Sequence, residues 1–326
     1  MSHRKVMLDI QRSWPQFDVV TARELTTAGI GDKLRRAGVK LGVLYKLRRG
    51  AYVRADLWDG ATLAMRELMR IRAHFLSTPH AGVYTHATAA RLHGLHVWDV
   101  PPLIHLSQPF ASTRSARGPD TVTYHQHLDA ADIVTLNGPR GERYAVTSPE
   151  RTVVDCARTL EEHRAAIIGD HALREGADWE QMHSLLRAMT GTRGIRKARS
   201  VVAALDGRSE SPGETRTRLL FRSFDVPMPE PQIHVRSRVG RHRGDFGWRG
   251  LKLIAEFDGK SKYFEYHPTD EAIYAERRRE RALMEENWSF LRIEWRDLSR
   301  PWELKARLLR AMQRAAAWSG IRDNAG

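Results

Sequence analysis

The sequence predicts a multidomain α+β protein. Its 326 residues exceed the size of one ordinary small domain, and 41% of them are hydrophobic, which is enough to build buried cores. Segments with helical spacing of apolar residues alternate with strand-like segments. A cluster of turn-forming residues at 206–213 marks the clearest boundary. We therefore expect three domains, at residues 1–58, 59–208 and 209–326.

The composition favours a polyanionic partner. The formal net charge is +14, and neutralising phosphates with basic side chains releases counterions, which draws such a protein to nucleic acid. No apolar run reaches the roughly 18 residues that a membrane-spanning helix needs, so we expect no membrane partner. Cys156 is the single cysteine and excludes an intrachain disulfide. The N-terminus lacks the apolar core of a signal peptide, and we expect a cytoplasmic protein.

The first domain begins with a helix that Thr21 and Glu24 open in a capping-box pattern. Residues 29–31 break it, and a second helix follows over 32–37. Strand-like residues 40–47, a basic turn and a short strand over 51–54 complete the segment. This order is typical of a winged helix-turn-helix, whose second helix enters the major groove while the wing touches the DNA backbone.

Basic side chains lie where that arrangement would place them against phosphates. Phosphate contacts position a protein on DNA without specifying a sequence. The expected nucleic-acid contacts are Lys33, Arg35 and Arg36 on the second helix, with Arg48 and Arg49 at the wing tip. The alternative is a small basic α+β domain whose charges only form a solvated face.

The middle domain is expected to be α/β. An amphipathic helix is predicted over 61–76, with strands at 104–107 and 122–125. Thr85 can cap a short helix that Gly94 ends, and Ser148 followed by Pro149 starts another. From there to residue 205 the pattern is mostly helical. The histidines of this region have spacings that match no usual set of metal ligands, and Cys156 is expected to be a small buried side chain.

The last domain is predicted to run α-β-β-β-α-β-α. The first helix covers 211–224, and the strands cover 232–236, 243–248 and 251–257. A charged helix over 269–286, a strand over 290–295 and a closing helix over 302–318 follow. The second and third strands form a hairpin, because a turn at Arg249-Gly250 separates them.

That hairpin brings acids together. Asp245 lies on one strand, while Glu256 and Asp258 lie on one face of its neighbour because side chains alternate along a strand. With Glu214 from the first helix they predict a site for Mg²⁺ or Mn²⁺, since hard cations prefer carboxylates and water. Lys260 and Lys262 follow and can offset phosphate charge. A plainer interpretation is that Glu214 only completes a capping box with Ser211, and that Asp258-Gly259 is a turn.

These residues resemble a known family. Glu214, Asp245 and Glu256-x-Asp258, followed by a basic helix, are similar to the PD-(D/E)xK nuclease superfamily, and more narrowly to very-short-patch-repair endonucleases. The resemblance covers about residues 211–315 and implies a restriction-endonuclease-like domain, a mixed sheet flanked by helices. It matches Glu214 to the helix-borne acid, and Asp245 and Glu256 to the metal-binding pair. Arg279 fits an Arg-Glu pattern of this branch and is expected to contact DNA or support the site.

The sequence departs from that family at Asp258, where the common motif has lysine. Lys260 or Lys262 would then supply the positive charge from a shifted position. With these roles the expected catalytic set is Glu214, Asp245, Glu256, Asp258, Lys260 and Lys262, and the expected metal ligands are the first three.

The front of the chain has its own resemblance. Residues 15–55, the run from Tyr84 to Leu95 and the run from Thr147 to Asp155 are similar to antitoxins of the AbiEi type. These are bipartite proteins of type IV toxin–antitoxin systems, and the resemblance implies a winged helix followed by a domain that meets a cognate toxin.

Two functions follow from the sequence. The first is a bacterial protein that binds double-stranded DNA and hydrolyses its phosphodiesters with Mg²⁺. The alternative is a non-enzymatic antitoxin or transcriptional autoregulator in which the nuclease fold is only a binding scaffold. RNA as the nucleic acid stays open, because basic charge does not separate it from DNA.

Overall fold

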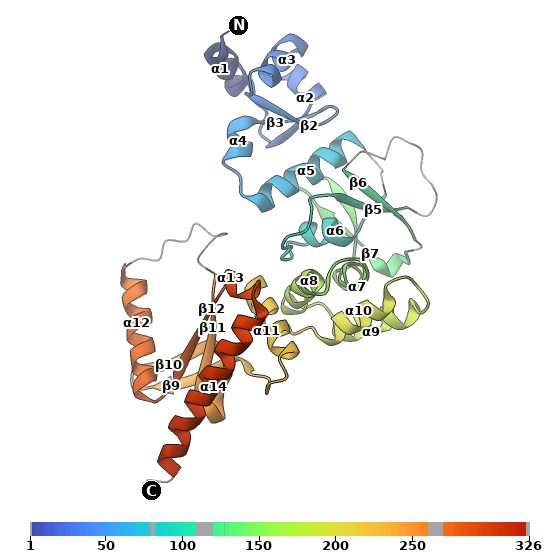
Figure 1. Cartoon of the computed structure of the whole chain (residues 1–326). Coiled ribbons are helices and arrows are strands. Elements are labelled where there is room, and N and C mark those ends of the chain that lie inside the picture. The colour runs from blue at the N-terminus through green and yellow to red at the C-terminus, as the bar shows by residue number, and fades with distance from the viewer. Residues whose placement is uncertain (1, 79–81, 109–119, 127, 260–269, 324–326) are drawn as a thin grey trace. The chain divides into compact units, whose positions relative to one another are not determined.

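The computed structural model describes residues 2–78, 82–108, 120–126, 128–259 and 270–323. They form an α+β protein with three separate sheets, so the predicted multidomain α+β class is confirmed at that level (Figure 1). By its contacts the chain divides into two compact units, Met1–Cys156 and Ala157–Gly326, which we call the first and second units. The finer division into three domains stays a prediction.

The first unit begins with helices around a three-stranded antiparallel sheet of order β1-β3-β2. Its elements are α1 (His3–Ser13), β1 (Val19–Thr21), α2 (Ala22–Thr27), α3 (Asp32–Lys40), β2 (Leu44–Arg48), β3 (Ala51–Arg54) and α4 (Ala55–Asp59). The capping box at Thr21 is confirmed, because its hydroxyl accepts from Glu24 N and the Glu24 carboxylate accepts from Thr21 N. The helix α1 was not expected, and it buries Val6 and Ile10 in the core of this segment.

The rest of the first unit is a five-stranded mixed sheet of order β6-β5-β4-β8-β7 with helices against it. The elements are α5 (Leu63–Ser77), β4 (Val83–Tyr84), α6 (His86–Leu92), β5 (Ile104–Gln108), β6 (Thr121–His125), η2 (Ala130–Asp132), β7 (Ile133–Asn137), β8 (Arg143–Thr147) and α7 (Pro149–Thr159), which runs across the division between the units. The predicted helix over 61–76 and the strands near 104 and 122 are confirmed, whereas the β7–β8 hairpin was missed.

The second unit contains helices followed by a four-stranded mixed sheet of order β12-β11-β10-β9, in which β11 and β12 are parallel. The elements are α8 (Glu162–Arg174), α9 (Trp179–Ala188), α10 (Ile195–Ala203), α11 (Pro212–Ser223), β9 (Glu230–Ser237), β10 (Gly240–Trp248), η3 (Arg249–Leu251), β11 (Leu253–Asp258), α12 (Asp270–Glu285), β12 (Ser289–Glu294), α13 (Trp295–Leu298) and α14 (Pro301–Asp323). The predicted helix and strand order over 211–318 is confirmed, with α13 as an addition.

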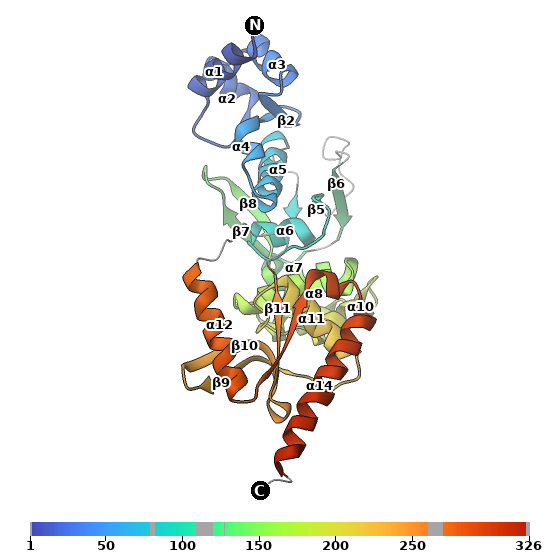
Figure 2. The same cartoon turned by 60° about the vertical axis from the view of Figure 1, so that its left-hand side comes forward.

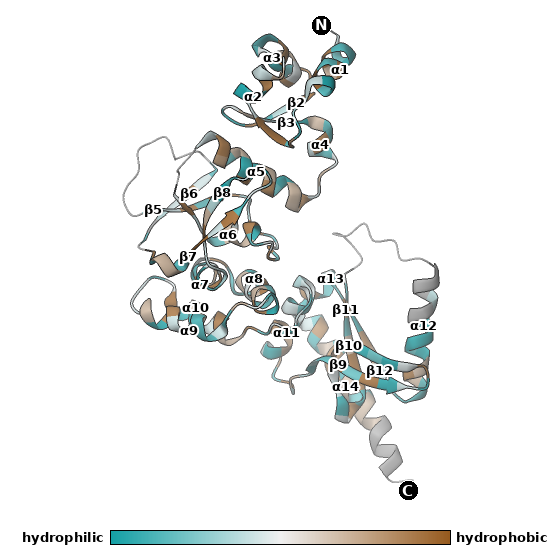
Figure 3. Ribbon diagram, turned by 180° about the vertical axis from the view of Figure 1, so that it is seen from behind, coloured by the Kyte–Doolittle hydropathy of each residue, from teal (hydrophilic) through white to brown (hydrophobic). Residues whose placement is uncertain are grey.

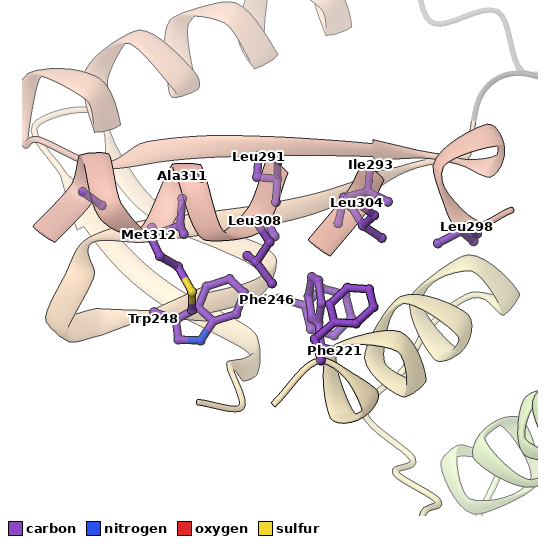
Figure 4. Packing of buried hydrophobic residues seen from close by; sticks show 14 residues of the cluster. Phe221, Phe246, Trp248, Leu291, Ile293, Leu298, Leu304, Leu308, Ala311 and Met312 are labelled. Atoms are coloured by element: carbon purple, nitrogen blue, oxygen red, sulfur yellow. The ribbon is translucent and has the colours of Figure 1, made fainter. Parts of the chain in front are cut away.

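Helices cover both faces of this sheet (Figure 2). Phe221 of α11 and Leu304 and Leu308 of α14 pack with Phe246 and Leu291 of the strands on one face (Figure 4). On the other face Leu283 of α12 packs on Ile233, Val235 and Ile254. In Figure 3 the strands of this sheet are coloured partly brown and partly teal, and the part of α12 that carries colour is mostly teal. Three of the acids expected at the site, Asp245, Glu256 and Asp258, therefore lie in a sheet that is held between two layers of helices.

A buried ion pair joins α11 to α8. Arg218 Nη2 donates to Asp170 Oδ2 at 2.7 Å, and the Arg218 side chain is only 7% exposed. The same Asp170 oxygen accepts from Thr215 Oγ1 at 2.8 Å, while its other oxygen accepts from Asp206 N at 2.8 Å. Arg218 also donates to the carbonyl of Ala204. The polar groups that enter this region are thus paired, and the network fixes the position of α11.

No helix within the described ranges is long and apolar enough to cross a membrane.

Candidate functional site

The N-terminus of α11 holds Glu214 in place. Ser211 is the N-cap and accepts from Glu214 N at 3.2 Å, and its hydroxyl donates to Glu214 Oε1 at 2.8 Å. The other carboxylate oxygen accepts from Glu210 N at 2.9 Å and from Gln232 Nε2 at 2.8 Å. Ser211 therefore caps the helix, but the Glu214 carboxylate accepts from the N–H of Glu210 and not from that of Ser211, so the capping box of the plainer interpretation is only half formed. Glu214 is also buried and bound by a side chain from strand β9.

Gly213 lets α11 approach the end of β11. A Cβ at this position would lie 1.9 Å from the ring of Phe257. Because a real Cβ never comes that close to a ring carbon, any other residue would push the helix and Glu214 away from the sheet. The helix-borne acid and the strand acids depend on this contact for their spacing.

Asp245 lies on β10 beside Glu214. Its Oδ2 accepts from the backbone N–H of Phe257 at 2.7 Å. Burial, and next the negative charge of Glu214, raise the pKa of Asp245 to about 6, against the partial relief that the Phe257 N–H provides. Burial also raises the pKa of Glu214. These two carboxylates have no ion-pair partner among the residues that the structure describes.

Glu256 is buried on β11 and is held by two guanidinium groups. Arg279 Nη2 of α12 donates to Glu256 Oε1 at 2.8 Å, and Arg292 of β12 pairs with the other oxygen. Arg292 also binds Glu280 at 3.2 Å. Arg279 thus contacts one of the expected site acids, and both roles expected for it stay predictions. Arg292 was missed, although it stands next to Glu256 in the parallel register of β11 and β12.

The remaining expected catalytic residues lie at or beyond the end of β11. Asp258 is the last residue of the strand and pairs in register with Glu294. Lys260 and Lys262 lie outside the described residues. Within the described ranges, no group of three His, Cys, Asp or Glu side chains is arranged as it would be to hold a metal ion. The structure therefore brings Glu214 and Asp245 together and places Glu256 on the adjacent strand, bound to arginines.

The second candidate site is a basic one, on α3 and the β2–β3 hairpin of the first unit. A pocket of about 440 Å³ is lined by Arg35, Arg36, Lys40 and Lys46 together with Asp32, Val39 and Tyr52. Arg35 binds Asp32 at 2.6 Å and lies over the Tyr52 ring. The Arg36 side chain is 81% exposed, and Lys33 on the same helix is exposed as well. Lys40 and Lys46 were not among the expected contacts, because only the fold brings them to this pocket.

The two wing-tip arginines, Arg48 and Arg49, differ in their exposure and in their partners. Arg49 is exposed. Arg48 donates to both oxygens of Asp120, at 2.5 and 2.6 Å, and its side chain is 14% exposed. Contact of Arg48 with a phosphate would require this ion pair to open, and that role stays a prediction.

Several histidines buried in the first unit contact neighbouring tyrosines. His74 Nδ1 lies 2.8 Å from Tyr84 Oη, and the rings of His86 and Tyr124 stack at 3.8 Å. Burial lowers the pKa of His105 to about 3 and that of His74 to about 4, so both are neutral inside the domain. Burial raises the pKa of the Cys156 thiol, which fits the small buried side chain that the sequence predicts.

No family model matches the chain. It is similar to two uncharacterized proteins of Mycobacterium tuberculosis, MT2308 of strain CDC 1551 and Rv2248 of strain H37Rv. Each is 30% identical over 275 residues, which cover 83% of this chain and 96% of the mycobacterial protein. The similarity thus extends over both units.

Proposed function

The chain belongs to one family with these two mycobacterial proteins, and we propose that it is a DNA-binding protein whose second unit hydrolyses DNA phosphodiesters with Mg²⁺. The observation that carries the proposal is the approach of two carboxylates, the buried Glu214 and the half-buried Asp245, that lack an ion-pair partner among the described residues and raise the free energy of the metal-free site. A buried, uncompensated negative charge of this kind favours a bound cation.

The arrangement around these acids supports a nuclease-like fold. Helix α11 is followed by three antiparallel strands, and β12 then joins β11 in parallel after α12. This is the order implied by the resemblance to PD-(D/E)xK nucleases. The order of α2, α3 and the β2–β3 hairpin likewise supports a winged helix-turn-helix in the first unit.

The donor set suits a hard divalent cation. Glu214, Asp245 and Glu256 would hold Mg²⁺ or Mn²⁺, which would polarise the scissile phosphate and help generate hydroxide. The protein's own side chains would hold the ligands in place and bind the phosphates of the substrate. Arg279 and Arg292 hold Glu256, and the exposed Arg277, Arg278 and Arg281 of α12 can bind phosphates. Asp258 would assist the ligands, and Lys260 or Lys262 would offset phosphate charge.

A specific observation favours the second candidate, a non-enzymatic regulator or antitoxin that meets a cognate toxin. Glu256 already has two arginine partners in this structure, so a cation must compete with them. Asp258 also stands where the nuclease motif has lysine. In this candidate the arrangement of acids is a scaffold, and DNA binding by the first unit is the main activity.

Plasmid cutting tests the nuclease. The full-length protein is expected to nick supercoiled DNA with Mg²⁺ or Mn²⁺, and Asp245→Asn and Glu256→Gln are each expected to lose this activity while staying folded. Glu230→Gln is the matched control, because this acid is also in the second unit but is exposed and paired with Arg249. Equal cutting by Glu256→Gln would remove the assignment. Intact binding with no cutting by the wild type would favour the regulator.

DNA binding by the basic pocket makes a separate prediction. Replacing Arg36 and Lys46 together with alanine is expected to weaken binding to duplex DNA of any sequence. The slope of log affinity against log salt should fall by about 2, roughly one for each lost phosphate contact. A fluorescence titration at several salt concentrations measures this slope. Arg143→Ala, an exposed arginine of β8, is the control. An unchanged slope for the double variant would exclude the pocket, and tighter binding to duplex RNA would identify RNA as the partner.

A further inference from the structure

Gln232 has an unusual backbone conformation for a strand residue. Its φ is 53°, in the left-handed region that a non-glycine residue adopts only when its surroundings impose it. The antiparallel ladder pairs Ile233 with Gly244 and Pro231 with Phe246, and it omits the pair between them. That omitted pair is Gln232 and Asp245, so the strained residue stands opposite the acid with the raised pKa.

The partner strand is irregular at the same point. A Cβ on Gly244 would lie 3.5 Å from Ile233 Cγ2, and one on Gly247 would lie 2.4 Å from Ile233 Cδ1. Residues three apart in a regular strand face opposite sides of the sheet, yet both glycines face Ile233. Strand β10 therefore turns between them, at Asp245. The distortions of β9 and β10 thus lie opposite each other and position the side chains of Gln232 and Asp245.

The Gln232 amide has one partner and one free oxygen. Its Nε2 donates to Glu214 Oε2 at 2.8 Å. Its Oε1 is buried and has no hydrogen-bond partner among the described residues. A flipped amide would set its oxygen against the Glu214 carboxylate, so the electrostatics favour this orientation. A buried carbonyl oxygen without a donor costs free energy, which indicates that a donor occupies this place in the working protein.

We propose that Gln232 is a positioning residue of the metal site: its Nε2 fixes the Glu214 carboxylate, and its Oε1 accepts a hydrogen bond from the hydration shell of the bound cation. This inference rests on the proposed function. Mg²⁺ keeps several of its waters when bound by one or two carboxylates, and those waters need acceptors. Outer groups of this kind orient ligands and tune a metal site.

Two substitutions separate this role from a structural one. Gln232→Met keeps the length of the side chain and removes the amide. Gln232→Gly removes the side chain and suits the left-handed backbone. Both are expected to weaken Mn²⁺ binding about 10-fold or more, as measured by isothermal titration without DNA. Unfolding in urea without metal should find Gln232→Gly at least as stable as the wild type, because the strain and the unpaired oxygen are gone. Gln181→Met, at an exposed glutamine of α9, is the control.

The outcomes distinguish the two proposals. Normal Mn²⁺ affinity in both variants would overturn the role of Gln232 and leave the nuclease standing. Loss of metal-free stability in both variants with unchanged affinity would make the residue structural and also overturn it. A wild-type protein that binds no Mn²⁺ would overturn both the metal site and this role.

Discussion

Replacing Asp170 with alanine is expected to lower the free energy of unfolding of the second unit by about 3–5 kcal/mol. The change leaves the buried guanidinium of Arg218 without its carboxylate, and Thr215 and the Asp206 N–H lose an acceptor. Burial raises the pKa of Asp170 even beside Arg218, which reflects how little water reaches the pair. A substitution that leaves an uncompensated charge in such a place is among the most destabilising single substitutions.

Unfolding in guanidinium chloride, followed by tryptophan fluorescence, measures this loss of stability. Hydrogen exchange of peptides from α8 and α11 locates the loss in the second unit. Arg249→Ala is the matched control, since it breaks an exposed ion pair with Glu230 and should cost less than about 1 kcal/mol. A similarly small loss for Asp170→Ala would mean that the network rearranges around the gap, and α11 would then not depend on it.

Asp245→Asn is expected to stabilise the protein at neutral pH. The folded-state pKa is raised to about 6 from an ordinary value of 3.8, so ionisation costs more in the folded state than in the unfolded state. The wild type therefore loses stability as the pH rises from about 4 to about 6. Asparagine does not ionise and can still accept from Phe257 N. At 1.36 kcal/mol per pKa unit the gain approaches about 3 kcal/mol above that window and vanishes below it.

Urea unfolding without metal at several pH values measures this difference. Glu230→Gln should change stability in the opposite direction, because Arg249 lowers the pKa of Glu230 and its charge is favourable in the folded state. Equal stability of Asp245→Asn and the wild type at neutral pH would show that Glu214 and Asp245 are not in conflict, and the argument for a cation there would fail. A stabilised variant that no longer cuts DNA would show that the site is maintained at the expense of stability.

Local patterns predicted most of the elements in the second unit. Helical and strand periodicity, with turn formers between, placed the helix that carries Glu214 and the strands that carry Asp245 and Glu256. The Thr21 capping box was also predictable, because it depends on residues three apart. The α1 helix was missed because its two buried residues, Val6 and Ile10, lie in a mostly polar stretch.

The partners of the site residues could not be predicted in the same way. Arg292 meets Glu256 only because β12 joins β11 in parallel after an intervening helix. Arg48 binds an acid 72 residues away, so the local pattern showed only a basic turn. The left-handed backbone of Gln232 has no local signal either, since glutamine rarely adopts it. These contacts depend on tertiary structure, and they decide which charges are available to a ligand.

Strand β9 is one of the two edge strands of its sheet, and its irregularity has a consequence for self-association. A regular edge offers a repeating row of N–H and C=O groups with which another chain can pair. In β9, Pro231 has no N–H, and the next residue, Gln232, departs from extended backbone. The repeat is interrupted where the strand is most apolar, beside Ile233. The conformation that aims an amide at Glu214 thereby also makes this edge a poorer template for pairing with another chain.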